Sequence, residues 1–458
     1  MSTAAAPQSS IVVDSLVENC GHEGLIPQCD LGPDSLLQFV HIPKTAGTSI
    51  RKFLDIHFSP HEVFPAEVVI QAYPGITDDH LFERLDERRM GRYRLLRGHH
   101  TADVTRPFLS VYKDRIVRFT VLREPMSQLI SEYGMCLHDP AFPLRDEFLA
   151  GPATFSDYLR FFKFRWVWRG DRQASHVVKQ VYPTEQQPPR ADWARLAQAQ
   201  LESYAMVGIF ERLHDSVELL AYILGWEAPA AVGHLNKSMH QGSLPELSAE
   251  DRALIDERYA GDRQLFQRAN ARFDLAYRQM LHDLGLTDAP DEIDRETLRA
   301  RINAHAAARR EARLSACPKK DHYETISTEG VILCFIDRTR GMQVEWIGPE
   351  PRAVMRFGFV EPSDRLLLVE VQYWLTEQML DDLRATVNGV EVRLARQADG
   401  NRQVFTGFVP RQAIEINPRD ARLELTTSSV NTPADLGLNP EDNETKCLAL
   451  SAIQFISP

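Results

Sequence analysis

One short stretch of the chain places a lysine and several small residues between a strand pattern and a helix pattern. The apolar run 36–42 predicts a buried strand, and the pattern from about Ser49 predicts a helix. Small residues in the intervening loop allow several backbone N–H groups to point at one anion, and the positive end of the helix attracts the same charge. Lys44 adds a mobile positive charge. The stretch therefore predicts a phosphate-binding loop made of Lys44, Thr45, Ala46, Gly47, Thr48 and Ser49.

The order of these residues differs from the Walker motif. In GxxxxGK[ST] the lysine follows the glycine, whereas Lys44 precedes Gly47 here. An ordinary nucleoside triphosphatase is therefore disfavoured. The residues alone leave open a plain strand–turn–helix unit with a solvated lysine.

The segment HIPKTAGTS resembles the 5′-phosphosulfate-binding loop of carbohydrate sulfotransferases related to heparan sulfate 2-O-sulfotransferase. These enzymes use the donor 3′-phosphoadenosine 5′-phosphosulfate (PAPS). In that family an Arg, a Pro and a Ser after a second buried strand bind the 3′-phosphate, and Arg123, Pro125 and Ser131 match them here. The interval of 131 − 123 = 8 residues is that of the family, although Gln128 replaces a second Arg often found on this helix. The resemblance covers about residues 35–280.

The resemblance also implies a mechanism of in-line sulfuryl transfer. Lys44, with the loop amides and Thr48, would stabilise the leaving phosphate, so no metal is required. A His in a Gly-His element is the general base of the family, and Gly98-His99 matches it. His100 is the second candidate, and a purely structural histidine is the alternative.

Two further segments could contact substrates. The segment 155–173 interleaves aromatic residues with Arg165, Arg169 and Arg172. It forms either a cleft for a saccharide acceptor or a helix core with a charged outer face. The segment HLNKS (234–238) is either a contact for the adenosine or 3′-phosphate of the donor or a solvated loop.

The elements that must position these residues alternate along the chain. Apolar runs at 36–42, 94–97, 116–122 and 204–210 predict strands, and helical patterns lie between them. This alternation predicts an α/β fold with a parallel sheet flanked by helices. The resemblance implies the P-loop-like sheet of the sulfotransferase fold. We expect an N-terminal lead-in over residues 1–34 and the PAPS-binding domain over 35–285.

The C-terminal third has a different texture. We expect a helical connector over 286–320, because 292–315 is rich in Ala, Arg and Glu with few apolar positions, as in a solvated helix. Short strand patterns then fill 321–458, and Asn388-Gly389 is a strong hairpin signal. They predict an all-β accessory domain, which we expect to be a sandwich. Glycan binding and a structural or oligomerising role are both open for it.

Composition limits the class of protein. With 458 residues, 25% charged and 43% hydrophobic, the chain is an ordinary globular protein of two or three domains. The net charge of −12 disfavours nucleic acid as a partner. Six cysteines without paired spacing argue against a zinc site and for a reducing compartment. No membrane-length apolar run and no signal-peptide pattern are visible, so we expect a cytoplasmic protein. Whether it forms a homo-oligomer is open.

Three functions compete. The first is a PAPS-dependent sulfotransferase acting on a carbohydrate hydroxyl. The second is a non-catalytic glycan-binding protein with a vestigial nucleotide site, and it is disfavoured because Lys44, His99, Arg123 and Ser131 are all present. The third is an atypical phosphoryl-transfer enzyme, which should have a carboxylate for Mg²⁺ where Arg123 stands.

Overall fold

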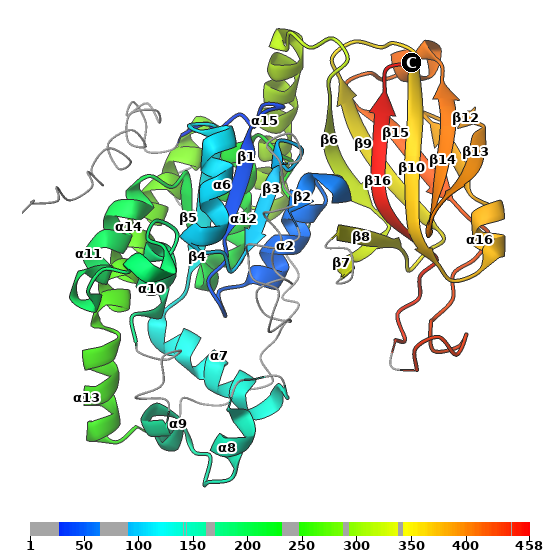
Figure 1. Ribbon diagram of the computed structural model, residues 1–458. Coiled ribbons are helices and arrows are strands. Elements are labelled where there is room, and N and C mark those ends of the chain that lie inside the picture. The colour runs from blue at the N-terminus through cyan, green and yellow to red at the C-terminus, as the bar shows by residue number, and fades with distance from the viewer. Residues whose placement is uncertain are drawn as a thin grey trace, which may run out of the picture.

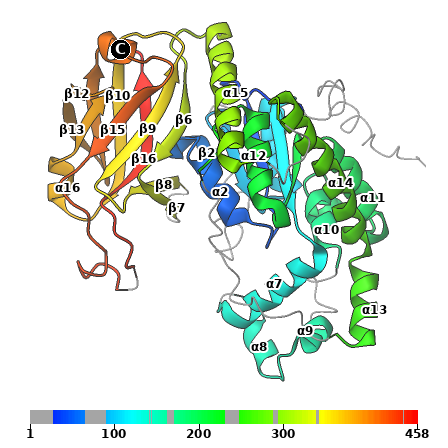
Figure 2. The same cartoon turned by 180° about the vertical axis from the view of Figure 1, so that it is seen from behind.

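The computed structural model describes residues 27–64, 90–140, 142, 144–161, 170–230, 247–286, 293–337, 342–440 and 442–458. In these residues an α/β unit and a β-rich unit lie side by side, with a long helix leading from one to the other (Figures 1 and 2). In the same part of the chain, no helix has both the length and the apolar character that crossing a bilayer requires.

The α/β unit is built on a five-stranded sheet. Its strand order is β2-β3-β1-β4-β5, and every neighbouring pair is parallel. The central strand β1 and its neighbour β4 are nearly continuous apolar runs, as expected for strands that helices cover on both faces. Because the chain leaves β1 toward one side of the sheet and later adds β4 on the other, the carboxyl end of β1 is a switch point, where α/β proteins bind ligands. The strands are β1 (Leu36–Val40), β2 (Val63–Phe64), β3 (Leu95–Gly98), β4 (Ile116–Leu122) and β5 (Met206–Ile209).

Helices cover both faces of this sheet. Helix α6 packs against one face, where Phe108 joins Leu36 and Leu96 in an apolar cluster. Helices α2, α12 and α14 contribute to the larger core on the other face; α6 lies in front of the sheet in Figure 1 and α12 in front of it in Figure 2. The helices are α2 (Gly47–Asp55), α6 (Ala102–Tyr112), α7 (Pro125–His138), α8 (Arg145–Leu149), α9 (Phe155–Phe161), α10 (Arg172–Val178), α11 (Trp193–Glu202), α12 (Leu213–Leu224), α13 (Ala249–Arg258) and α14 (Ala260–Asp283).

The helix after the α/β unit, α15 (Arg295–Ala316), is less solvated than its composition indicates. Leu298, Ile302 and Leu314 are each at most 1% exposed. The few apolar residues recur at helical spacing, so they form one buried stripe, which also includes Arg310. The expectation of a mainly solvated connecting helix is therefore wrong for this face, which packs against α12 and β9.

The β-rich unit consists of two antiparallel sheets with a shared apolar core, as the sandwich prediction requires. One sheet has the order β13-β14-β10-β16-β8-β7 and the other β12-β11-β15-β9-β6. Asn388 and Gly389, with φ of 50° and 81°, form the turn between β11 and β12, so the predicted hairpin is confirmed. The elements are β6 (Tyr323–Glu329), β7 (Val331–Asp337), β8 (Met342–Ile347), β9 (Arg352–Phe359), β10 (Arg365–Trp374), α16 (Glu377–Asp381), β11 (Arg384–Val387), β12 (Val390–Val392), β13 (Leu394–Asp399), β14 (Arg402–Val409), α17 (Arg411–Glu415), β15 (Ala421–Thr426) and β16 (Leu448–Ile456).

Candidate active site

The loop between β1 and α2 has an unusual backbone. Lys44 and Ala46 have φ of 68° and 72°, in the left-handed region that residues with a side chain rarely adopt. The fully buried Thr45 holds the loop in place, because its hydroxyl donates a hydrogen bond of 2.8 Å to the carbonyl of Ile42. Such turns aim successive N–H groups at one point, and α2 begins immediately after at Gly47. The loop therefore has the backbone shape of an anion-binding nest, held at a cost in strain that marks functional loops.

His41, which the sequence analysis did not nominate, lies between this loop and His99. A Cβ atom on Gly47 would stand 1.7 Å from Nε2 of His41, so the ring fills the space that the missing side chain leaves. The His41 ring also stacks on the His99 ring, with centroids 4.1 Å apart. His41 is thus in contact with both predicted parts of the site. In the sequence, the only feature that could have pointed to His41 is its position directly before the segment IPK.

His99 follows the last residue of β3 and is held through its ring. Its Nδ1 lies 2.7 Å from the backbone carbonyl oxygen of His41. Because a carbonyl only accepts, Nδ1 carries the proton, and in the neutral ring the lone pair is on Nε2. The neighbouring His100 is 2% exposed, whereas His99 is half-buried. Of the two candidate bases, His99 is therefore the one with access to solvent.

Arg123, directly after β4, contacts the loop after β1. Its Nη1 donates a hydrogen bond of 3.0 Å to the backbone carbonyl of Lys44, and its Nε donates one of 3.0 Å to the Ser127 hydroxyl. The guanidinium also lies 4.0 Å from the centre of the Phe210 ring, which follows β5. The two motifs that are 79 residues apart in the chain thus meet at the carboxyl edge of the sheet.

Helix α7 adds two of the nominated positions. Gln128 takes the place of the second family Arg, and its amide donates a hydrogen bond of 2.8 Å to the carbonyl of Pro43. This hydrogen bond holds α7 against the loop, so the uncharged Gln128 has a structural role at this position. Ser131 lies one turn further along α7, 6% exposed.

A buried carboxyl group balances the cations of the site. Glu132 is 1% exposed and forms an ion pair with Arg172, the first residue of α10. Burial raises the pKa of Glu132 to about 7, against the opposing effect of Arg172, Lys44 and Arg123. Burial also lowers the pKa of Lys44, with Arg123 and Arg172 lowering it and Glu132 raising it. Three cations thus act on Glu132, while Glu124 and Glu211 also act on Arg123, and Asp139 acts on Lys44.

The remaining predicted segments are placed in part. In 155–161, Phe155 and Tyr158 are buried in an apolar cluster around α7, as the core alternative predicts. Residues 162–169, with Arg165 and Arg169, and the segment 234–238 lie outside the described residues. Among the residues that the structure does describe, no group of three His, Cys, Asp or Glu side chains is arranged to bind a metal.

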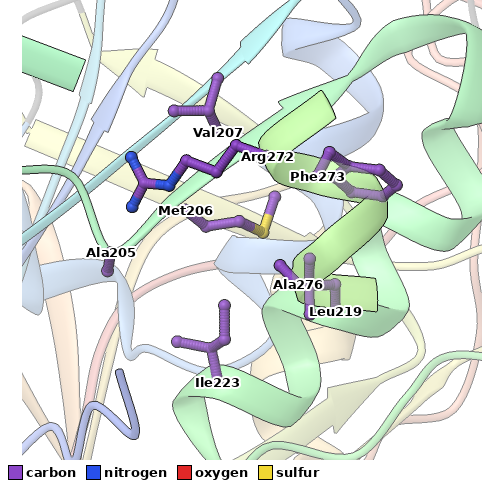
Figure 3. A pocket seen from close by; sticks show the side chains of 8 residues that line it. All are labelled: Ala205, Met206, Val207, Leu219, Ile223, Arg272, Phe273 and Ala276. Atoms are coloured by element: carbon purple, nitrogen blue, oxygen red, sulfur yellow. The ribbon is translucent and has the colours of Figure 1, made fainter. Parts of the chain in front are cut away.

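The cavity drawn in Figure 3 is not part of this site. It has a volume of about 10 Å³ and is lined mainly by apolar side chains of β5, α12 and α14, such as Met206, Leu219 and Phe273. A space of this size holds at most one water molecule. It is a gap in the packing of the core, at the amino-terminal end of β5.

The fold and the site together define an α/β protein with a nest-shaped loop at the carboxyl end of a central parallel strand. A model of the sulfotransferase family matches residues 28–284, which is more than half of the chain. The chain therefore belongs to the sulfotransferase family, a family of PAPS-dependent transferases.

Other comparisons add little. No curated protein matches the chain. Among solved structures, the chain is similar to BtGH115A, a family GH115 4-O-methyl-α-glucuronidase with specificity for decorated arabinogalactans, at 8% identity and a TM-score of 0.19. The alignment covers 83% of this chain and 48% of that enzyme, so the chain spans about half its length. A likeness of this size bears on neither the fold nor the function.

Proposed function

We propose that the protein transfers a sulfuryl group from PAPS to a hydroxyl of a carbohydrate acceptor. The observation that carries the proposal is the hydrogen bond of 3.0 Å from Arg123 to the carbonyl of Lys44. It places the two motifs of the family resemblance side by side, as is needed to bind the 5′-phosphosulfate and the 3′-phosphate of a single ribose. The choice of a carbohydrate acceptor rests on the resemblance alone, and a cytoplasmic location stays a prediction.

The loop would bind one charged end group of the donor, and Arg123 with α7 would bind the other phosphate. The amides of residues 44–49 would hold the 5′-phosphosulfate, and Lys44 would stabilise the charge that develops on the leaving phosphate oxygen. Arg123 and Ser131 would bind the 3′-phosphate. The fit is supported by the left-handed turn at Lys44 and Ala46, by the half-buried side chain of Lys44, and by the three cations that act on the buried Glu132. Partial burial strengthens each of these charge interactions, because less water screens them.

His99 would act as the general base. With Nδ1 donating to the His41 carbonyl, Nε2 would accept the proton of the acceptor hydroxyl. The hydroxyl oxygen forms a bond to sulfur while the bond from sulfur to the phosphate oxygen breaks, so the products are a sulfate ester and 3′-phosphoadenosine 5′-phosphate. The electron pair of the broken bond stays on the phosphate next to Lys44, and no external oxidant or reductant is needed.

The first test is thermal unfolding with the desulfated donor, 3′-phosphoadenosine 5′-phosphate, and with ATP·Mg²⁺ as the control. A ligand at ~100 times its dissociation constant adds about 2.7 kcal/mol to the free energy of unfolding. We expect a rise in the melting temperature with the bisphosphate alone, and a smaller rise in Arg123→Ala. No rise at millimolar bisphosphate would remove the donor assignment and leave glycan binding as the function to test. A positive result leads to transfer of labelled sulfate from PAPS to a panel of glycans.

A further inference from the structure

A buried polar cluster joins the α/β unit to the β-sandwich. Asp55, the last residue of α2, receives two hydrogen bonds from Arg97 in β3: Nε to Oδ1 at 2.7 Å and Nη2 to Oδ2 at 3.1 Å. The third member, Gln343, comes from β8 of the sandwich, and its Oε1 accepts from Nη2 of Arg97 at 2.9 Å. Figures 1 and 2 both show β8 beside α2.

These groups are removed from water, so each depends on its partners. Arg97 is 1% exposed, Asp55 8% and Gln343 2%. A buried cation that loses an acceptor is costly, because no water replaces the hydrogen bond. The sandwich therefore supplies an acceptor that the guanidinium of the other unit needs.

A second residue of β8 fits the same charge balance. Glu345 lies two residues from Gln343, on the same face of the strand, and is 4% exposed. Burial, with Asp55 adding to it and Arg97 opposing it, raises the pKa of Glu345 well above its usual value. Arg51, one turn before Asp55 on α2, forms an ion pair with it at 3.5 Å, so two guanidinium groups, Arg97 and Arg51, lie beside the carboxyl group of Asp55.

The two elements that meet in this cluster are those that carry the chemistry. Helix α2 begins at Gly47 in the phosphate-binding loop and ends at Asp55. In β3, Arg97 is followed by Gly98 and then by His99. The same interface continues where Nδ1 of His57 lies 2.7 Å from the carbonyl oxygen of Ile326 in β6. The cluster thus fixes the end of the loop helix and the end of the strand that holds the base.

We propose that Gln343 is a positioning residue for sulfuryl transfer and that the β-sandwich is a required part of the catalytic unit. The role in transfer rests on the proposed function, whereas the coupling between the units does not. Gln343 acts through Arg97: it orients the guanidinium, which holds β3 against α2 and so fixes His99 relative to the loop at Lys44. The sandwich thus affects the reaction indirectly, because none of its groups contacts a substrate in this proposal.

The chain offers a matched control for this proposal. Gln403 in β14 is also a buried glutamine of the sandwich, and its Oε1 accepts from Nε of Arg396 at 2.9 Å. In the sheet, β14 is separated from β8 by β10 and β16. Gln403→Leu therefore makes the same chemical change in the same domain, away from the interface.

The experiment compares Gln343→Leu, Gln343→Glu and Gln403→Leu as full-length proteins. The readouts are amide exchange of the peptides 47–55 and 95–99, and the rate and pH profile of His99 carbethoxylation by diethyl pyrocarbonate. In Gln343→Leu we expect at least tenfold faster exchange in both peptides and at least a threefold change in His99 reactivity. Gln343→Glu, which keeps the acceptor, should stay within twofold of wild type, and Gln403→Leu should leave both readouts unchanged.

The outcomes separate this proposal from the proposed function. Wild-type exchange and reactivity in Gln343→Leu, or equal effects in Gln403→Leu, would overturn the positioning role. If Gln343→Leu does not fold, Gln343→Asn takes its place, since it withdraws the acceptor by one methylene, and the same criteria hold. Binding of 3′-phosphoadenosine 5′-phosphate to the wild type is measured separately by calorimetry, so a failed donor assignment is seen independently of the exchange data.

Discussion

Replacing Gly47 by alanine tests the packing of the site through the sign of a stability change. At the first residue of a helix, Gly→Ala alone should stabilise the protein by about 0.5–1 kcal/mol. Here the new Cβ would stand 1.7 Å from Nε2 of His41, whereas real Cβ contacts are not shorter than 3.0 Å. The ring must therefore withdraw by at least 3.0 − 1.7 = 1.3 Å. It cannot do so freely, because it is stacked on His99 at 4.1 Å and on Phe39 at 5.4 Å.

Overpacking of this kind costs about 1–3 kcal/mol, so we expect Gly47→Ala to lower the free energy of unfolding by about 1–2 kcal/mol net. The assay is urea unfolding followed by circular dichroism. Gly32→Ala is the control, because a Cβ there meets only the Ser35 hydroxyl at 3.7 Å, an ordinary contact. The control should change the free energy of unfolding by less than about 0.5 kcal/mol.

A double-mutant cycle isolates the contact between Gly47 and His41. In a His41→Ala background the ring is absent, so Gly47→Ala should become stabilising by about 0.5–1 kcal/mol. The sign therefore reverses between the two backgrounds. A stabilising or neutral Gly47→Ala in the wild type, or the same loss in both backgrounds, would refute the assignment of His41 as the residue that fills the space beside the loop.

Three further predictions concern the chemistry and the pH dependence. Lys44→Ala and His99→Ala should each leave the fold intact and lower turnover by about 10²–10⁴ in the sulfate-transfer assay, and near-wild-type turnover in either would remove that residue from the mechanism. Arg123→Ala should mainly weaken donor binding in calorimetry, and an unchanged affinity would contradict the placement of the 3′-phosphate. Burial lowers the pKa of His57 to about 3, so the unfolded chain gains a proton between pH 6.5 and 3 that the native state does not. Stability from this group is complete above pH 6.5 and falls by up to about 1.4 kcal/mol per pH unit below it, which urea unfolding should show for the wild type. His57→Phe should lack this dependence, and an equally steep fall of stability with pH in that variant would disprove the role of His57.

Local sequence pattern was sufficient for most of the fold. The run 116–122 is continuous and rich in β-branched residues, and β4 occupies those residues. Pro125 is the first residue of α7, and Ser248 and Asp251 form a capping box at the start of α13, which are positions that these residue types favour. Within 321–458, the strand β6 (Tyr323–Glu329) is hard to locate from the sequence, because its polar residues hide the alternation that buries Ile326 and Thr328.

The site residues that could be predicted are those that lie in contiguous sequence motifs. Lys44 and Arg123 are recognisable because each stands at the end of an apolar run, and the structure brings them into contact. Glu132 carries no such signal, since a charged residue in a helix pattern is usually solvated, and Arg172 was expected only as a possible acceptor contact or as part of a charged outer face. Their pairing depends on how α7 and α10 pack, which no local pattern records.

The region that the family model matches is shorter than the structural unit that holds the site. The family model ends at residue 284, yet Gln343, 246 residues after Arg97, accepts a hydrogen bond from that guanidinium. The carbonyl of Ile326 likewise lies against His57, so the α/β unit has buried polar groups whose partners lie beyond the matched region. A buried polar group that loses its hydrogen-bond partner is costly in free energy. A chain cut after residue 284 would leave several such groups without their partners. The structural unit around the loop therefore includes β6 and β8 of the sandwich, and β3, which ends one residue before His99, is held by both units.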